Sequence, residues 1–138
     1  MDSILMELQP SIIHYAAIIS KLLKVEVEIA DSNLVRVAGT GKYETFVNKS
    51  MQREGYVYKH VLETGVPEVV KEPGKSRFCS KCPKYGICEE EFEVCAPINF
   101  ENGVIGVIGL VCFDDEQKNN LLCDFNTYIE FLQQLSHF

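Results

Sequence analysis

The chain has 138 residues, which suits one domain with one hydrophobic core. With 46% hydrophobic and 24% charged residues it matches soluble globular proteins, and its longest apolar run, residues 104–113, is about half the length that crosses a bilayer. The net charge of −7 argues against a segment that holds nucleic acid through its phosphates.

The N-terminal residues do not predict an export signal, because Asp2 and Glu7 stand where a basic region would be and no cleavage site follows. We therefore expect a cytoplasmic protein. Apolar residues at helical spacing predict a helix over residues 11–24, with Ser11 as its N-cap. Pro10 would separate this helix from a short turn before it.

Two alternating segments, residues 25–31 and 34–39, predict a hairpin whose first strand is half-buried, with its glutamates on the polar face. Residues 53–64 predict a helix that ends at Gly65. Pro67 then starts a short extended piece.

Residues 91–100 alternate again and predict a strand in which Val94 and Ala96 face one way and Cys95 the other. The run at 104–113 is apolar on both faces, so we expect this strand at the centre of the sheet. Nearby glycines predict that another element packs closely against its backbone. They are Gly103, Gly106 and Gly109.

The last segment, from Asp114 onward, predicts a helix whose apolar residues follow steps of four and three. They are Leu121, Phe125, Tyr128, Leu132 and Leu135. This spacing fits either a coiled-coil seam or a helix that faces the core. The pattern runs into Phe138 without a glycine, proline or cap, so we expect a fragment cut from a longer protein.

These elements predict a single α+β domain over residues 1–138, with antiparallel strands in the middle and helices at both ends. The terminal helices would cover one face of the sheet. The middle helix and the long loop before residue 92 would cover the other face. We expect a ligand pocket between the sheet and that loop.

Four of the six cysteines lie close together, at Cys79, Cys82, Cys88 and Cys95, in the spacing C-x2-C-x5-C-x6-C. In a cytoplasmic protein this clustering points to metal binding or redox sensing more than to structural disulfides. The first two can offer thiolates from one turn, and Cys95 would reach the pocket face from its strand. All four are the candidate metal-binding and cofactor-binding residues.

Three states of these cysteines stay open. A 4Fe–4S cluster leads, because it accepts four thiolates from unevenly spaced cysteines. Tetrahedral zinc is the alternative, although structural zinc more often uses two C-x2-C pairs. The thiols can also hold no metal, as free thiols or a reversible disulfide. The basic residues around the first two cysteines are either a solvated loop patch or cations that stabilise thiolates or an anionic centre.

The remaining reactive side chains predict packing rather than chemistry. Cys112 and Cys123 are expected to be small buried hydrophobic residues. His60 has no ligand spacing to the cysteines, and Tyr58 is expected to pack in the core or on the surface. No hydrolase or dinucleotide motif is present, so we assign no catalytic residue and no enzyme activity to this segment.

Three stretches resemble the GAF/PAS-like sensor domains of bacterial transcription regulators. They are "VEVEIADSNLVRVAGTG", "PEVVKEPG" and "EVCAPINFENGVIGVIGLVCFDDEQKNNL". The strongest element is the hairpin "API-x-x-x-x-x-VIGVIGL", and the whole chain fits the layout. More narrowly, the chain resembles the N-terminal sensor segment of sigma-54-dependent regulators.

This resemblance implies an AAA+ ATPase domain and a helix-turn-helix DNA-binding domain beyond residue 138. The segment itself would be a homodimer through its terminal helices. It would bind a small-molecule effector and contact neither nucleic acid nor membrane, and its output would pass through the C-terminal helix. The resemblance names neither the effector nor the metal. The alternative function is a free-standing thiol redox module that uses Cys79 and Cys82.

Overall fold

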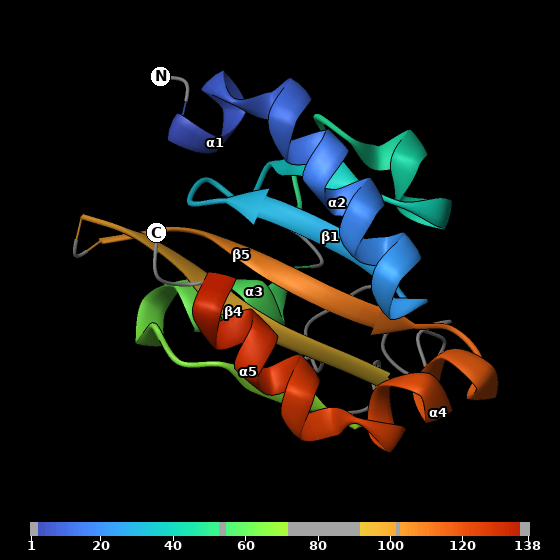
Figure 1. The fold of residues 1–138 in the computed structure, drawn as a ribbon. Helices are drawn as coiled ribbons and strands as arrows, with labels where there is room; N and C mark the ends of the chain where they lie inside the picture. The colour runs from blue at the N-terminus through green and yellow to red at the C-terminus, as the bar shows by residue number, and fades with distance from the viewer. Residues whose placement is uncertain (1–2, 53–54, 72–91, 102, 136–138) are drawn as a thin grey trace.

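The structure, a computed structural model, describes residues 3–52, 55–71, 92–101 and 103–135 (Figure 1). Within these ranges the strands form one antiparallel five-stranded sheet in the order β2-β1-β5-β4-β3. Their bounds are β1 (Glu26–Asp31), β2 (Arg36–Gly39), β3 (Glu68–Val70), β4 (Phe92–Phe100) and β5 (Gly103–Cys112). The predicted α+β class with a central antiparallel sheet is confirmed.

Strand β5 lies at the centre of the sheet, as its apolar sequence predicts. It pairs with β1 on one side, where Leu110 lies opposite Val27, and with β4 on the other, where Ile108 lies opposite Ala96. Residues 106–112 are all buried. A strand with neighbours on both edges and helices on both faces has no room for an exposed polar side.

Two of the three glycines have the close backbone contacts that we expect. A Cβ atom at Gly106 would overlap the Leu5 side chain, and one at Gly109 would overlap the hydroxyl of Tyr58. At Gly103 an added Cβ would meet only ordinary van der Waals contact. The prediction therefore holds for the two glycines in the buried part of β5 and is wrong for Gly103, near the hairpin turn.

The N-terminal helix differs from its prediction at its start. Helix α1 (Ile4–Glu7) is capped by the side chain of Ser3, and α2 (Gln9–Leu23) follows it directly. Pro10 lies in the first turn of α2, where its missing N–H has no intrahelical partner to lose. The prediction that Ser11 is the N-cap is therefore wrong.

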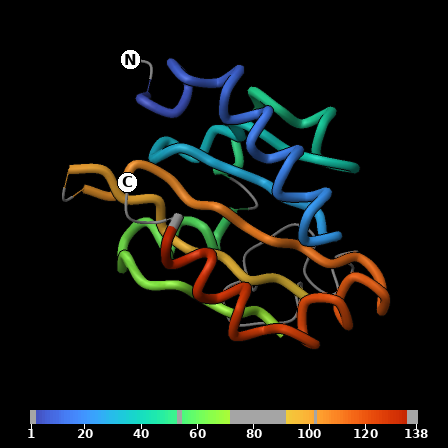
Figure 2. Tube along the Cα trace, in the orientation of Figure 1, coloured from blue at the N-terminus to red at the C-terminus, as the bar shows by residue number. Residues whose placement is uncertain are grey.

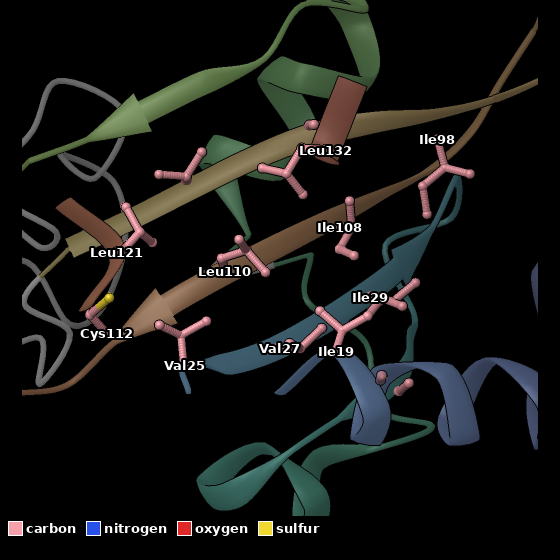
Figure 3. Packing of buried hydrophobic residues seen from close by; sticks show 14 of the residues in the cluster. Ile19, Val25, Val27, Ile29, Ile98, Ile108, Leu110, Cys112, Leu121 and Leu132 are labelled. Carbon is pink, nitrogen blue, oxygen red and sulfur yellow. The ribbon is translucent and has the colours of Figure 1, made fainter. Parts of the chain in front are cut away.

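The terminal helices cover one face of the sheet (Figures 1 and 2). Helix α2 packs on β1 and β2, α5 (Phe125–Leu135) packs on β4, and α4 (Asp115–Cys123) packs on β5. Their buried side chains meet those of the sheet in one apolar cluster (Figure 3). Its labelled members include Ile19, Val27, Ile29, Ile108, Leu110, Leu121 and Leu132.

The C-terminal segment is two helices, not the single helix that we predict, because the chain breaks at Asp124. This residue has φ −136° and ψ 41°, outside helical geometry. Its carboxylate accepts a hydrogen bond of 2.8 Å from the hydroxyl of Thr127, in the first turn of α5. Asp is favoured at such N-terminal positions because it bonds the start of a helix from a non-helical conformation.

The apolar four-and-three spacing faces the core. Leu121 and Leu132 are buried, and Phe125 and Tyr128 pack partly buried against the same cluster. The Tyr128 hydroxyl also donates a hydrogen bond of 3.2 Å to the carbonyl of Leu23, which joins α5 to the end of α2. The structure therefore shows that these four residues face the core and do not form a coiled-coil seam.

The opposite face of the sheet carries α3 (Tyr56–Thr64) and the short 3-10 helix η1 (Gly41–Phe46). Helix α3 confirms the predicted helix, although it begins at Tyr56, and Gly65 ends it with a positive φ of 68°. Its apolar side packs on β4 and β5 through a second buried cluster. Helix η1 is not predicted, since its residues show no apolar period.

The two isolated cysteines have different outcomes. Cys112 is buried in the cluster beneath the terminal helices, as expected. Cys123 is exposed, so its prediction is wrong: it ends α4 two residues after Leu121, which takes the buried position. Residues two apart on a helix face different directions.

Among the described helices, none is both long and apolar enough to cross a membrane.

Candidate functional site

Polar side chains gather on the α3 face of the sheet, around Gly109 at the middle of β5. Glu28 on β1 and Cys95 on β4 are the two register partners of Gly109, so both lie on its face. Glu93 precedes Cys95 by two residues and shares this face. Both glutamates are buried, which is rare for a carboxylate unless it has partners.

Arg36 on β2 provides one of these partners. Its Nε donates to Oε2 of Glu28 at 2.7 Å, and both side chains are 4% exposed. The rings of Tyr43 and Phe46 on η1 lie beside the guanidinium, with centroids 5.2 and 5.5 Å from its central carbon. Helix η1 therefore encloses a buried cation with aromatic faces, which favour positive charge.

This arrangement corrects the prediction for β1. The sequence predicts a half-buried strand with one polar face, but Glu28 is 3% exposed and the α3 face is covered. The alternation correctly separates the two faces, since Val27 and Ile29 lie beneath α2. It cannot tell a solvated polar face from a buried polar site, because both show the same period of two.

Tyr58 brings a hydroxyl from α3 onto the centre of this face. The residue is 2% exposed, and its hydroxyl lies against Gly109. Burial, together with the carboxylates of Glu28 and Glu93, raises the pKa of Tyr58 well above its ordinary value, so the phenol keeps its proton. Sequence reasoning expected only packing here, and the glycine opposite is the one signal that indicates more.

Cys95 lies where its strand pattern predicts. It is buried on the α3 face with Tyr58 and Val107, while Val94 and Ala96 lie beneath the terminal helices. The thiol donates a long hydrogen bond, 3.8 Å, to the carbonyl of Glu68 on β3.

The surroundings of Cys95 favour the thiol over the thiolate. Burial raises its pKa well above the usual value, and the carboxylates of Glu93 and Glu68 raise it further. A metal ligand must be the thiolate. To act as a metal ligand, Cys95 would therefore have to lose its proton and its hydrogen bond to the Glu68 carbonyl.

The other three predicted ligands, Cys79, Cys82 and Cys88, lie outside the described residues. The same holds for the alternative redox pair, Cys79 and Cys82. Among the side chains that the structure does describe, no three of His, Cys, Asp and Glu are grouped as a metal site. His60 on α3 instead lies 3.3 Å from the carboxylate of Glu68 and so ties α3 to the edge of the sheet.

Similar solved structures define the fold. The A. aeolicus nlh2 GAF domain in an inactive state covers 93% of this chain and 77% of its own, with TM-score 0.61 and 18% identity. A GAF domain/HD domain protein from Geobacter sulfurreducens covers 97% of both chains, with TM-score 0.58 and 14% identity. The GAF domain of a Coxiella burnetii phosphoenolpyruvate-protein phosphotransferase reaches TM-score 0.62 at 12% identity, over 84% and 76% of the chains. The chain has the GAF fold.

One curated protein is similar in sequence over nearly the whole chain. It is the candidate uric acid sigma-54-dependent transcriptional regulator UacR of Escherichia coli (strain K12), which is 31% identical over 135 residues. The match covers 98% of this chain and 23% of that protein, so the chain spans about a quarter of its relative. No family model matches the chain. The chain is thus a GAF-fold domain that is homologous to one segment of a sigma-54-dependent regulator.

The contrast between buried and exposed cysteines gives a direct test. In a variant with Cys79, Cys82 and Cys88 changed to serine, we expect Ellman's reagent at about pH 8 to modify Cys123 rapidly. Cys95 and Cys112 should react only after denaturation. Both are buried, and the pKa of Cys112 is raised to about 12 by burial and by Asp114. Adding Cys123→Ser should remove the rapid phase, and a rapid phase that persists would contradict the burial of the other two.

Proposed function

We propose that this chain is the signal-sensing domain of a sigma-54-dependent transcriptional regulator. The observation that supports this most is the 31% identity, over 98% of the chain, to a segment of such a regulator, on a domain with the GAF fold. We propose that the full-length protein continues beyond residue 138 into an AAA+ ATPase domain and a helix-turn-helix domain. In that arrangement this segment regulates an activity that the other domains perform.

The α3 face is the effector site in this proposal. It buries one guanidinium, on Arg36, and two carboxylates, on Glu28 and Glu93. Because the relative's name includes uric acid, we propose uric acid or a related purine as the first candidate effector. Its ring N–H groups could donate to carboxylates and its carbonyl oxygens could accept from the guanidinium, in exchange for present partners.

The cysteine segment supplies a second part of the proposal. We propose that Cys79, Cys82, Cys88 and Cys95 hold a 4Fe–4S cluster, with zinc as the alternative. Cys95 would join this set only in its deprotonated form. On binding the cluster or zinc, the thiol would release the carbonyl of Glu68 on β3. Because Glu68 also contacts His60, binding or loss of the metal would affect α3 as well.

We further propose that the domain forms a homodimer through its terminal helices. The apolar residues of α4 and α5 at four-and-three spacing pack in the core, so we place the dimer surface elsewhere. The outer side of α2 presents apolar residues at heptad spacing, with Tyr15 59% and Leu22 71% exposed. Leu8 and Ile18 continue this stripe. A second copy of the same helix is the partner that this repeat fits.

Binding of uric acid should stabilise the domain. A ligand that binds only the folded state at a hundredfold excess over its Kd contributes about 2.7 kcal/mol. Thermal unfolding followed across a uric acid titration should therefore show a rising Tm. Benzoate, a planar anion without ring N–H groups, is the control. The effector assignment fails if uric acid gives no shift or if benzoate gives the same one.

The metal centre is tested on anaerobically purified protein, by visible absorption and metal analysis of one sample. We expect a broad band near about 400 nm and about four irons per chain. Serine at any of Cys79, Cys82, Cys88 or Cys95 should remove most of both, while Cys123→Ser, on the exposed end of α4, should keep them. About one zinc per chain would support the zinc site in place of the cluster. A metal-free protein would contradict both metal proposals and would favour the alternative function, a thiol redox module.

Charge placed on the α2 stripe should separate the dimer. We expect a variant with Ile18→Glu and Leu22→Glu to become monomeric, because two facing helices would bury unpaired carboxylates. Light scattering after gel filtration measures the mass, and circular dichroism checks the fold. Leu122→Glu, at an exposed leucine of α4, is the matched control and should remain dimeric. A dimeric double variant, or a monomeric wild type, would exclude this surface.

A further inference from the structure

The hydroxyl of Tyr58 is a buried polar group for which the described part of the chain provides no hydrogen-bond partner. Among the described residues it is the one buried side-chain nitrogen or oxygen in this condition. Enclosing a hydroxyl without a partner costs folding free energy, so native proteins rarely do so without a reason. Here the hydroxyl, which α3 carries, lies against Gly109 of β5, the central strand of the sheet.

Packing alone does not explain this hydroxyl. Val57 and Val61 bury the neighbouring parts of α3 in the same cluster, and the ring of Tyr58 packs with them. A phenylalanine would fill the same space without an unpaired polar atom. The chain also has glycine at position 109, where any side chain would overlap the hydroxyl. Gly109 thus leaves room for both the Tyr58 ring and its hydroxyl.

We propose that the Tyr58 hydroxyl is the group that recognises the effector, by donating a hydrogen bond to a carbonyl oxygen of a small cyclic amide. This inference rests on the proposed function, in that it takes the α3 face as the effector site. Tyr58 and Gly109 are thereby specificity-determining residues of that site.

The charges around the hydroxyl select the chemical class of the ligand. Glu28 and Glu93 lie close enough to act electrostatically on Tyr58, and like charges repel in a buried site. Arg36 offsets one of these charges, but a carboxylate ligand would still bring its full charge on the oxygens that face two carboxylates. A carbonyl oxygen of a cyclic amide accepts the phenolic proton without that cost, and the ring N–H groups beside it suit the acidic surroundings.

Entry of such a ligand requires movement of α3. Tyr58 is enclosed in the structure, and the helix that carries it has Gly55 at its N-cap position, without a side-chain hydrogen bond to cap it. The helix is nine residues long and is held to the sheet by its apolar side and by the contact between His60 and Glu68. Ligand binding at Tyr58 therefore changes the position of α3 relative to β3 and β4.

The first test needs no ligand. We expect Tyr58→Phe to raise the Tm of the isolated domain by a few degrees, because it removes a buried group that has no partner. Tyr56→Phe, at a half-buried position of the same helix, is the matched control and should leave the Tm unchanged. A lower Tm for Tyr58→Phe would mean that the hydroxyl is bonded within the fold, and it would overturn the inference.

The second test uses uracil, a planar cyclic amide with two carbonyl oxygens, in ligand-observed NMR titrations. We expect the wild type and Tyr56→Phe to bind it and Tyr58→Phe to bind at least about tenfold more weakly, which corresponds to about 1.4 kcal/mol. Benzoate should bind to none of them. Equal uracil binding by wild type and Tyr58→Phe overturns the inference and leaves the effector site standing. Absence of uracil binding to the wild type counts against the effector site itself, and the inference falls with it.

Discussion

The structure depends on a sheet that is buried on both faces. Strand β5 has a strand on each side and helices on both faces, so a polar side chain beside it costs folding free energy unless it finds a partner inside the protein. Glu28 and Arg36 meet this requirement with a buried ion pair of 2.7 Å. Because either charge alone would be costly in this environment, the pair ties β1, β2 and η1 into one unit.

The two faces of the sheet differ in what they contribute. The face beneath α2, α4 and α5 holds the larger apolar cluster, which provides most of the hydrophobic burial. The α3 face holds the ion pair, the Cys95 thiol and the Tyr58 hydroxyl, which add little apolar burial. Natural proteins place unfavourable local features where function requires them. This division is the physical basis for assigning effector binding to the α3 face.

The sequence predicts the apolar part of the fold well. Periods of two place Val94 and Ala96 beneath the helices and Cys95 on the other face, and the apolar run of β5 places it at the centre. These signals work because hydrophobic burial follows secondary-structure periodicity. The helix break at Asp124 was missed because an aspartate is tolerated in a helix and becomes a cap only in context.

The polar site was much less predictable. Arg36 and Glu28 are eight residues apart in the chain, and nothing local shows that a charge on each strand is buried with the other. Tyr58 and Gly109 meet across 51 positions of sequence, so their contact exists only after the sheet forms. The cysteine spacing carried the sequence-based hypothesis, yet the one described member, Cys95, is a buried thiol that bonds to Glu68.

The most direct test of the central claim, that the α3 face is a binding site, is a high-resolution crystal structure of the domain purified without oxygen. We expect electron density for a bound small molecule, other than an ordered water, within hydrogen-bond distance of the Tyr58 hydroxyl. A Tyr58 hydroxyl bonded only to protein atoms, on a face closed by side chains, would contradict the claim. The polar residues of this face would then serve the fold alone.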